Sequence, residues 1–131
     1  MRTIPKMTLD ELQNWLDRYV DAWRANDPET IAELFSEDAV YSFHPYDEGE
    51  ASARGREQIV AAWLETPDDP ASWEASYQAF AVDGDRAVAT GTSRYLAGEK
   101  EERFYHNCFL MRFDSDGRCA EFTEFYVRRP N

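Results

Sequence analysis

The stretch that decides the fold is residues 109–127, "FLMRFDSDGRCAEFTEFYV". Two runs in which apolar and polar residues alternate flank "DSDG", a turn sequence that predicts an antiparallel β-hairpin. With a two- or four-residue loop, Phe113 faces Arg118, and Asn107 faces Glu124 further along the ladder. Alternation then gathers one set of side chains on the more apolar face, which we assign to the interior: Tyr105, Asn107, Phe109 and Met111, with Ala120, Phe122, Glu124 and Tyr126.

Glu124 is the one charged side chain of its strand on this inward face. A buried carboxyl group either keeps its proton because of desolvation or is held ionised by a hydrogen-bond donor. Two interpretations stay open: an acid or base that lines a pocket, or a structural residue bonded to Asn107, Tyr105 or water. The register also puts Cys119 on the outer face and too far from Cys108 for a disulfide. An odd-length loop with a bulge would flip one strand.

Three helices are predicted before the main β region. The first begins after Thr8, which forms a capping box with Glu11, and ends at Asn26. Asp27 caps a short second helix, and residues 56–65 form the third. The first helix carries an apolar stripe at helical spacing: Leu9, Leu12, Leu16, Tyr19, Val20 and Trp23.

The remaining segments predict strands and loops. A first strand covers residues 39–45, and the polar loop 46–55 that follows is a candidate rim or lid. Residues 73–82 and 86–96 form a hairpin around Asp83-Gly84-Asp85. Because helices precede the strands instead of alternating with them, we expect an α+β fold with an antiparallel sheet, in a single domain over residues 1–131.

Composition excludes several classes of function. The formal net charge of −12 disfavours nucleic acid and anionic lipid as partners. No apolar run is long enough to span a membrane, and the N-terminal residues lack a signal-peptide core, so we expect a cytoplasmic protein. With two cysteines and two histidines, the sequence shows no metal-ligand spacing and no phosphate-binding loop, so we expect neither a metal nor a cofactor.

Other side chains are candidates for a site. His44 lies at the end of the first strand, where a histidine could move protons near neutral pH or could simply be on the surface. Tyr19 could present its hydroxyl to a cavity, and Trp23 and Trp63 could line it, although core packing is the commoner role of such aromatic residues. Arg94 could meet an anionic substrate. Two further residues are expected on the outer surface: Arg103 and His106.

Taken together, the chain resembles the NTF2-like superfamily, in its SnoaL-like and ketosteroid-isomerase-like branch. The resemblance covers nearly the whole length and rests on three segments: "RYVDAWRANDPETIAELFSEDAVYSFHP", "GREQIVAAWL" and the closing hairpin. It implies a curved sheet wrapped as a cone around the helices, an enclosed apolar pocket, and a homodimer formed through the convex face of the sheet. Tyr19 matches the tyrosine that donates to the oxyanion in ketosteroid isomerases. The general-base aspartate falls at His44 or Phe43, and the second aspartate falls at Phe109, so the isomerase triad is not intact.

Two functions follow as expectations. The first is an enzyme that uses His44, Glu124 and Tyr19 for cofactor-free acid/base chemistry on a small, mostly apolar organic molecule, of the isomerase, cyclase, dehydratase or hydrolase type. The second is a binding or dimerisation module without turnover. A protein-transport adaptor is a third possibility. The walls of the pocket are the same in the first two: Trp23, Trp63, Tyr105, Asn107, Phe109, Phe122 and Tyr126.

Overall fold

A computed structural model describes residues 7–49, 52–65, 70–96 and 103–130. In the order of the chain, the elements are α1 (Leu9–Ala25), α2 (Pro28–Leu34), β1 (Phe35–Ser42), β2 (Ala53–Arg54), α3 (Arg56–Glu65), a 3-10 turn η2 (Pro70–Ser72), β3 (Trp73–Asp83), β4 (Arg86–Tyr95), β5 (Arg103–Phe113) and β6 (Cys119–Arg128). The three predicted helices are therefore confirmed, including the Thr8–Glu11 capping box and the Asp27 cap. The first strand is shifted, since it begins at Phe35 and ends at Ser42, before His44.

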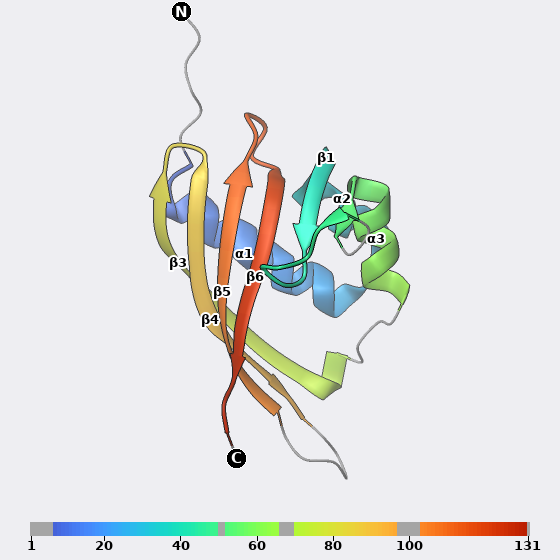
Figure 1. The fold of residues 1–131 in the computed structure, drawn as a ribbon, viewed down its shortest axis with the longest axis vertical. Helices are drawn as coiled ribbons and strands as arrows, with labels where there is room; N and C mark the ends of the chain where they lie inside the picture. The colour runs from blue at the N-terminus through green and yellow to red at the C-terminus, as the bar shows by residue number, and fades with distance from the viewer. Residues whose placement is uncertain (1–6, 50–51, 66–69, 97–102, 131) are drawn as a thin grey trace, which may run out of the picture.

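The strands form one mixed sheet in the order β2-β1-β6-β5-β4-β3. Neighbouring strands are antiparallel except for β1 and β6, which run parallel. The sheet curves, α1 runs along its concave side, and α2 and α3 lie beside β1 (Figure 1). The expected α+β fold, with a cone-shaped sheet that wraps around the helices, is confirmed.

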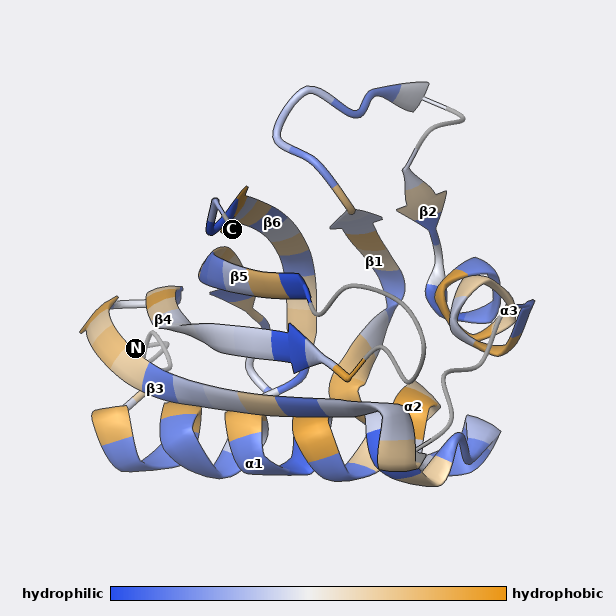
Figure 2. Cartoon of the chain, turned by 90° about the horizontal axis from the view of Figure 1, so that it is seen from below, coloured by the Kyte–Doolittle hydropathy of each residue, from blue (hydrophilic) through white to orange (hydrophobic). Residues whose placement is uncertain are grey.

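Helix α1 turns its apolar side toward the sheet (Figure 2). The buried stripe is displaced from the predicted one, because Leu9 is 49% exposed while Trp15 lies in the core. The Trp15 indole Nε1 donates a hydrogen bond to the backbone oxygen of Leu34 at 3.0 Å, which satisfies its polar atom inside the core. The buried residues of α1 follow helical spacing: Leu12, Trp15, Leu16, Tyr19 and Ala22.

The β5–β6 hairpin has a different register from the predicted one. Asn107 lies opposite Tyr126, and Phe109 lies opposite Glu124, so each pair is displaced by two residues along β6. A shift of two keeps every side chain on its face, and the inward assignment of Asn107 and Glu124 therefore survives. The ladder is irregular where Phe113 pairs with Cys119.

That irregularity reverses the predicted side of Cys119, which is fully buried instead of lying on the outer face. The loop spans five residues instead of two or four. Asp114 closes it: its backbone N–H bonds to the oxygen of Arg118, and its side chain accepts from the backbone N–H groups of Asp116 and Arg118. Gly117 has φ +78, a conformation that favours glycine. An odd-length loop thus accommodates the bulge.

Gly91 allows β3 and β4 to approach closely beside the site. A Cβ atom at this position would lie 2.1 Å from the backbone oxygen of Ser76 and 2.6 Å from the Tyr77 ring. Only glycine fits there. Because Gly91 has no side chain, the Tyr77 ring can pack across β4 toward the interior of the cone.

Candidate functional site

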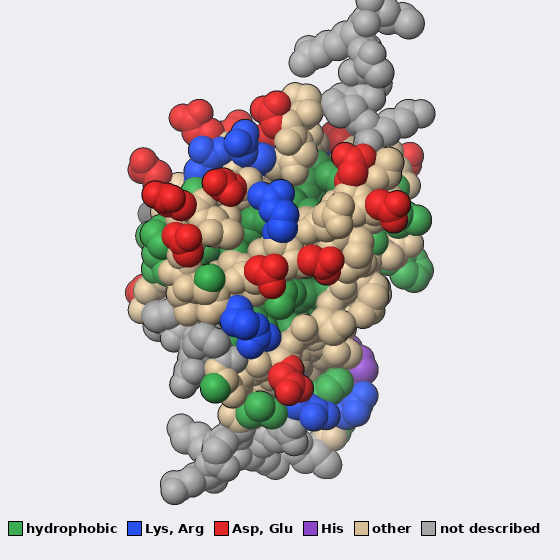
Figure 3. Space-filling view, turned by 180° about the vertical axis from the view of Figure 1, so that it is seen from behind, with side chains coloured by type: hydrophobic (Ala, Val, Ile, Leu, Met, Phe, Trp, Pro, Cys, Tyr) green, Lys and Arg blue, Asp and Glu red, His purple; other side chains and the backbone are tan. Residues whose placement is uncertain are grey.

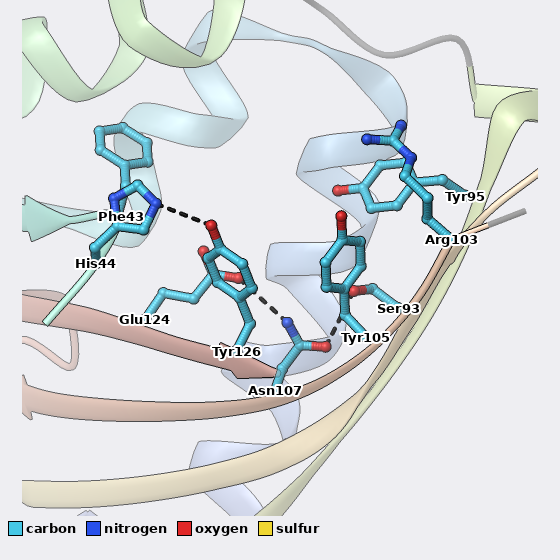
Figure 4. Close-up of a pocket in the computed structure, with 9 residues that line it drawn as sticks. All are labelled: Phe43, His44, Ser93, Tyr95, Arg103, Tyr105, Asn107, Glu124 and Tyr126. Carbon is cyan, nitrogen blue, oxygen red and sulfur yellow. Dashed lines mark hydrogen bonds between the residues drawn. The ribbon is translucent and has the colours of Figure 1, made fainter. Parts of the chain in front are cut away.

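Two adjoining cavities open in the concave side of the sheet. The first cavity has a volume of about 320 Å³ and the second about 220 Å³. Figure 4 shows the residues of the first: Phe43, His44, Ser93, Tyr95, Arg103, Tyr105, Asn107, Glu124 and Tyr126. Four residues line both cavities: Phe43, Ser93, Tyr95 and Glu124. Glu124 thus lies where the two spaces meet.

Glu124 is half-buried and is held by a chain of polar side chains. Asn107 donates from Nδ2 to Glu124 Oε1 at 3.3 Å, and Ser93 donates from Oγ to Asn107 Oδ1 at 3.0 Å. Burial raises the pKa of Glu124 to about 7, while the Asn107 hydrogen bond and the charge of His44 act in the opposite direction. Near neutral pH the carboxyl group therefore has both of its forms populated.

His44 follows the end of β1 and contacts the first cavity from the opposite wall. Its Nδ1 lies 3.2 Å from Asp47 Oδ2, and its Nε2 lies 2.9 Å from the Tyr126 hydroxyl oxygen. The ring also stacks on Tyr46 with centroids 5.0 Å apart. In a neutral ring whose Nδ1–H donates to Asp47, Nε2 is the acceptor and the Tyr126 hydroxyl donates to it. The predicted His44 and Tyr126 are thus brought together.

A pair of tyrosines lines the second cavity. The hydroxyl oxygens of Tyr19 and Tyr41 lie 2.8 Å apart in a hydrogen bond. Burial is the largest cause that raises the pKa of each phenol well above its ordinary value, and the charge of Glu124 adds to the effect. Both hydroxyl groups therefore keep their protons at neutral pH, and each can donate a hydrogen bond.

Of the predicted aromatic walls, Tyr105 and Tyr126 line the first cavity, and the other four separate into two groups. Trp23 and Trp63 line the second cavity, and Trp63 packs its ring edge-on against Tyr19 at a centroid distance of 5.2 Å. Phe109 and Phe122, by contrast, are each only 1% exposed and belong to the packed core, where their centroids lie 4.6 Å apart. These two phenylalanines support the floor of the cavities from behind and do not line either of them.

Several lining residues were not predicted from the sequence. Arg103, expected on the outer surface, is exposed but is on the inward face, where it also lines the first cavity. Ser93 was missed because a serine within a strand carries no signal of its own, and Tyr41 was missed because its partner is 22 residues away. The expectation for His106 is met, whereas Arg94 lies away from both cavities. His106 is exposed, and Arg94 is exposed with its guanidinium 5.4 Å from the Phe104 ring on the outer side.

Within the described ranges, no group of three or more His, Cys, Asp or Glu side chains is arranged to hold a metal ion. Among the same residues, no helix is both long and apolar enough to cross a membrane.

The fold and the cavity define a small α+β protein with a cone-shaped sheet around an internal space. A family model described as the SnoaL-like domain matches residues 16–122. The chain therefore belongs to the SnoaL-like family, within the NTF2-like superfamily. No curated protein sequence gives a significant match.

Solved structures with the same fold include three that cover most of both chains. An LEH-like epoxide hydrolase from M. tuberculosis has 15% identity and a TM-score of 0.66, covering 91% of this chain and 84% of its own. The epoxide hydrolase/cyclase-like enzyme SalBIII, with a role in pyran ring formation in the polyether salinomycin, has 14% identity and a TM-score of 0.68, covering 92% and 95%. A protein of unknown function with a cystatin-like fold from Methylobium petroleophilum PM1 has 19% identity and a TM-score of 0.68, covering 97% and 82%. At these identities the similarity shows the fold alone.

Proposed function

We propose that this protein is an enzyme that moves a proton on a small organic molecule by acid/base chemistry without a bound cofactor. The observation that carries the proposal is Glu124, a half-buried carboxyl group with a pKa of about 7 where the two cavities meet. A general acid or base is most effective when its pKa lies near the working pH. Glu124 would take a proton from carbon or water in its ionised form and return one in its neutral form.

The remaining polar groups have complementary roles in this proposal. Asn107, anchored by Ser93, holds one oxygen of Glu124 and leaves the other for the substrate. The Tyr19–Tyr41 pair in the second cavity would donate to a carbonyl oxygen as negative charge develops on it. His44, oriented by Asp47, would serve as the second proton-transfer group through Nε2 or through the Tyr126 hydroxyl.

Similarity to an LEH-like epoxide hydrolase and to an epoxide hydrolase/cyclase-like enzyme supports a reaction of the hydrolase or cyclase type. Isomerase and dehydratase reactions need the same elements, a base next to an acid in a space that excludes most water. The first cavity is more polar than the sequence predicted, since five of its lining residues carry polar or charged groups in addition to three tyrosine hydroxyls: His44, Ser93, Arg103, Asn107 and Glu124. The substrate should therefore have polar groups as well as an apolar body.

A panel of small probes tests the proposal. Styrene oxide, a β,γ-unsaturated ketone and a β-hydroxy ketone report epoxide opening, isomerisation and dehydration, and turnover in D₂O is followed by gas chromatography and by deuterium incorporation. We expect Glu124→Gln to lower turnover of the active probe by at least about 100-fold. Glu121→Gln is the matched control, since Glu121 is in the same strand but exposed, and should change the rate by less than about twofold.

A second candidate function is a binding module without turnover. The specific observation in its favour is that Asn107 and Glu124 are bonded to each other, so the pair already has a partner when the cavity contains no ligand. Binding of a probe would be seen as changes in the NMR spectrum. If probes bind but neither the wild type nor the Glu121→Gln control turns them over, the binding function is established in place of catalysis.

A further inference from the structure

Arg103 is a charged residue of the first cavity that has no role in the acid/base proposal. It begins β5 and lies directly opposite Tyr95 in the β4–β5 ladder, on the inward face of the sheet. Its guanidinium carbon lies 4.9 Å from the centroid of the Tyr95 ring. Figure 4 shows Arg103 and Tyr95 at one end of the cavity and His44 at the other. The cationic group is therefore held over an aromatic wall that faces the substrate space.

No carboxylate within the described part of the chain forms an ion pair with Arg103. A guanidinium group has five N–H donors in a planar fork that fits a carboxylate with two parallel hydrogen bonds. Stacking on Tyr95 uses the face of this fork and leaves its edge for other partners. The geometry therefore provides a cation with donors that can be directed at a ligand in the cavity.

Positive and negative side chains lie at different places along the first cavity. The chain as a whole has a formal charge of −12, yet Figure 3 shows basic side chains beside a histidine, with an acidic side chain close by, at the end of the molecule where β4 ends and β5 begins. Arg128 lies opposite Tyr105 on the inward face, whereas Arg94 and Arg129 flank the Phe104 ring on the outer face. Among the described inward-facing residues, Arg103 and Arg128 would attract an anion to this end of the cavity, and the ionised Glu124 further inside would repel it.

We propose that the substrate carries a carboxylate group, which Arg103 binds, and that an apolar body extends from it along Tyr95 and Tyr105 toward Glu124. Arg103 is then the residue that determines specificity, because it sets both the charge of the substrate and which end of it enters the cavity first. The assignment of a substrate rests on the proposed function, whereas the preference for a carboxylate over a neutral ligand of the same shape is a property of binding alone.

A matched pair of ligands tests the inference: 3-phenylpropanoate and its primary amide, 3-phenylpropanamide. Their dissociation constants are measured by NMR titration at pH 8, where the carboxylate is fully ionised. We expect the wild type to bind the carboxylate at least about tenfold more tightly than the amide, as a charge-assisted hydrogen bond is about twice as strong as a neutral one. Arg103→Gln should remove that preference and leave the affinity for the amide within about twofold.

Two further variants make the result specific. Arg103→Lys keeps the charge but loses the fork, and should retain only part of the preference. Arg118→Gln, in the β5–β6 loop and outside both cavities, should bind both ligands as the wild type does. Circular dichroism checks that each variant is folded. Equal affinity of the wild type for the two ligands, a preference that persists in Arg103→Gln, or the absence of binding by both up to about 10 mM would overturn the inference.

The carboxylate-binding test gives a result whether or not the protein is an enzyme. A carboxylate preference that depends on Arg103, found in a protein that turns over none of the probes, would support this inference and contradict the proposed enzyme. Turnover of neutral probes that depends on Glu124, without any carboxylate preference, would do the reverse.

Discussion

Asn107 and Glu124 are hydrogen-bonded along a diagonal of the β5–β6 ladder, since Asn107 lies directly opposite Tyr126 and Glu124 lies opposite Phe109. Diagonal neighbours on one face of a sheet are within reach of long side chains. Among the described residues, Glu124 supplies the one carboxyl group that lines either cavity, and the bond connects it to a buried amide that Ser93 holds in place. The protonation of Glu124 is therefore coupled to the orientation of Asn107.

Asn107→Leu should raise the pKa of Glu124 above its present value of about 7. The Asn107 hydrogen bond lowers this pKa, so that its removal leaves desolvation with less opposition. The measurement is a ¹³C NMR titration of the glutamate side-chain carboxyl groups. Ser93→Ala, which removes the bond that orients Asn107 but leaves the Asn107 amide in place, should shift the pKa in the same direction by less. A pKa for Glu124 that falls in Asn107→Leu would contradict the coupling.

Glu124 should also make the stability of the protein depend on pH. Its pKa in the folded state, about 7, lies above the ordinary value of 4.5. Between these values the unfolded chain releases a proton that the folded chain retains, so the contribution of Glu124 to the free energy of unfolding is largest below pH 4.5 and is lost as pH rises toward 7.

Glu124→Gln removes the titration of the Glu124 carboxyl group and leaves every other titrating group in place. The difference in the free energy of unfolding, wild type minus variant, should therefore fall by up to about 3 kcal/mol between pH 4.5 and pH 7.5 and should be constant above that. Urea unfolding at four pH values in this range provides the measurement. A difference that stays constant across the range would mean that Glu124 titrates as an exposed glutamate does.

The outer face of the sheet carries apolar side chains that support a homodimer, which we propose forms through this face. Leu110 is 44% exposed and Phe125 is 37% exposed, and both point away from the helices on neighbouring strands. Leu110→Glu should lower the mass measured by light scattering from twice the chain's 15.2 kDa to a single copy. Leu9→Glu, on the exposed start of α1, should leave the mass unchanged. A wild type that is monomeric at micromolar concentration would exclude the dimer.

The sequence predicted the face of each strand better than the pairing between strands. Alternation in "AEFTEFYV" identifies Glu124 as inward, because the period of two is a local property. The register depends on the loop, where the side chain of Asp114 forms backbone hydrogen bonds that its residue type permits but does not require. This is why the pairing was wrong by two residues and why Cys119 was placed on the wrong side of the sheet.

Some residues of the candidate site could be predicted from the sequence, and others could not. Glu124, Asn107, His44 and Tyr19 are recognisable because polar groups on an apolar face or beside a loop are informative by themselves. Arg103 is not recognisable, since an arginine at a strand end usually lies in solvent, and its contact with Tyr95 depends on the pairing of β4 with β5. Contacts between distant segments, such as His44 with Tyr126, leave no signal in a single sequence.

The Tyr19–Tyr41 pair provides a test of cooperation inside the second cavity. Each hydroxyl group is buried, and its partner in the structure is the other one. Tyr19→Phe or Tyr41→Phe alone should cost about 1–2 kcal/mol in the free energy of unfolding, because the remaining hydroxyl is left buried without that bond.

The double variant should then cost less than the sum of the two single variants, by about 1 kcal/mol, since it removes both members of the hydrogen bond. Urea unfolding of the four proteins at one pH completes the cycle. Tyr46→Phe combined with Tyr19→Phe is the control, because Tyr46 is 73% exposed and lies outside the pair, and these two changes should be additive. Additivity of Tyr19→Phe and Tyr41→Phe would show that the hydroxyl groups act independently, and the pair could then not serve as a single preorganised donor to a bound carbonyl oxygen.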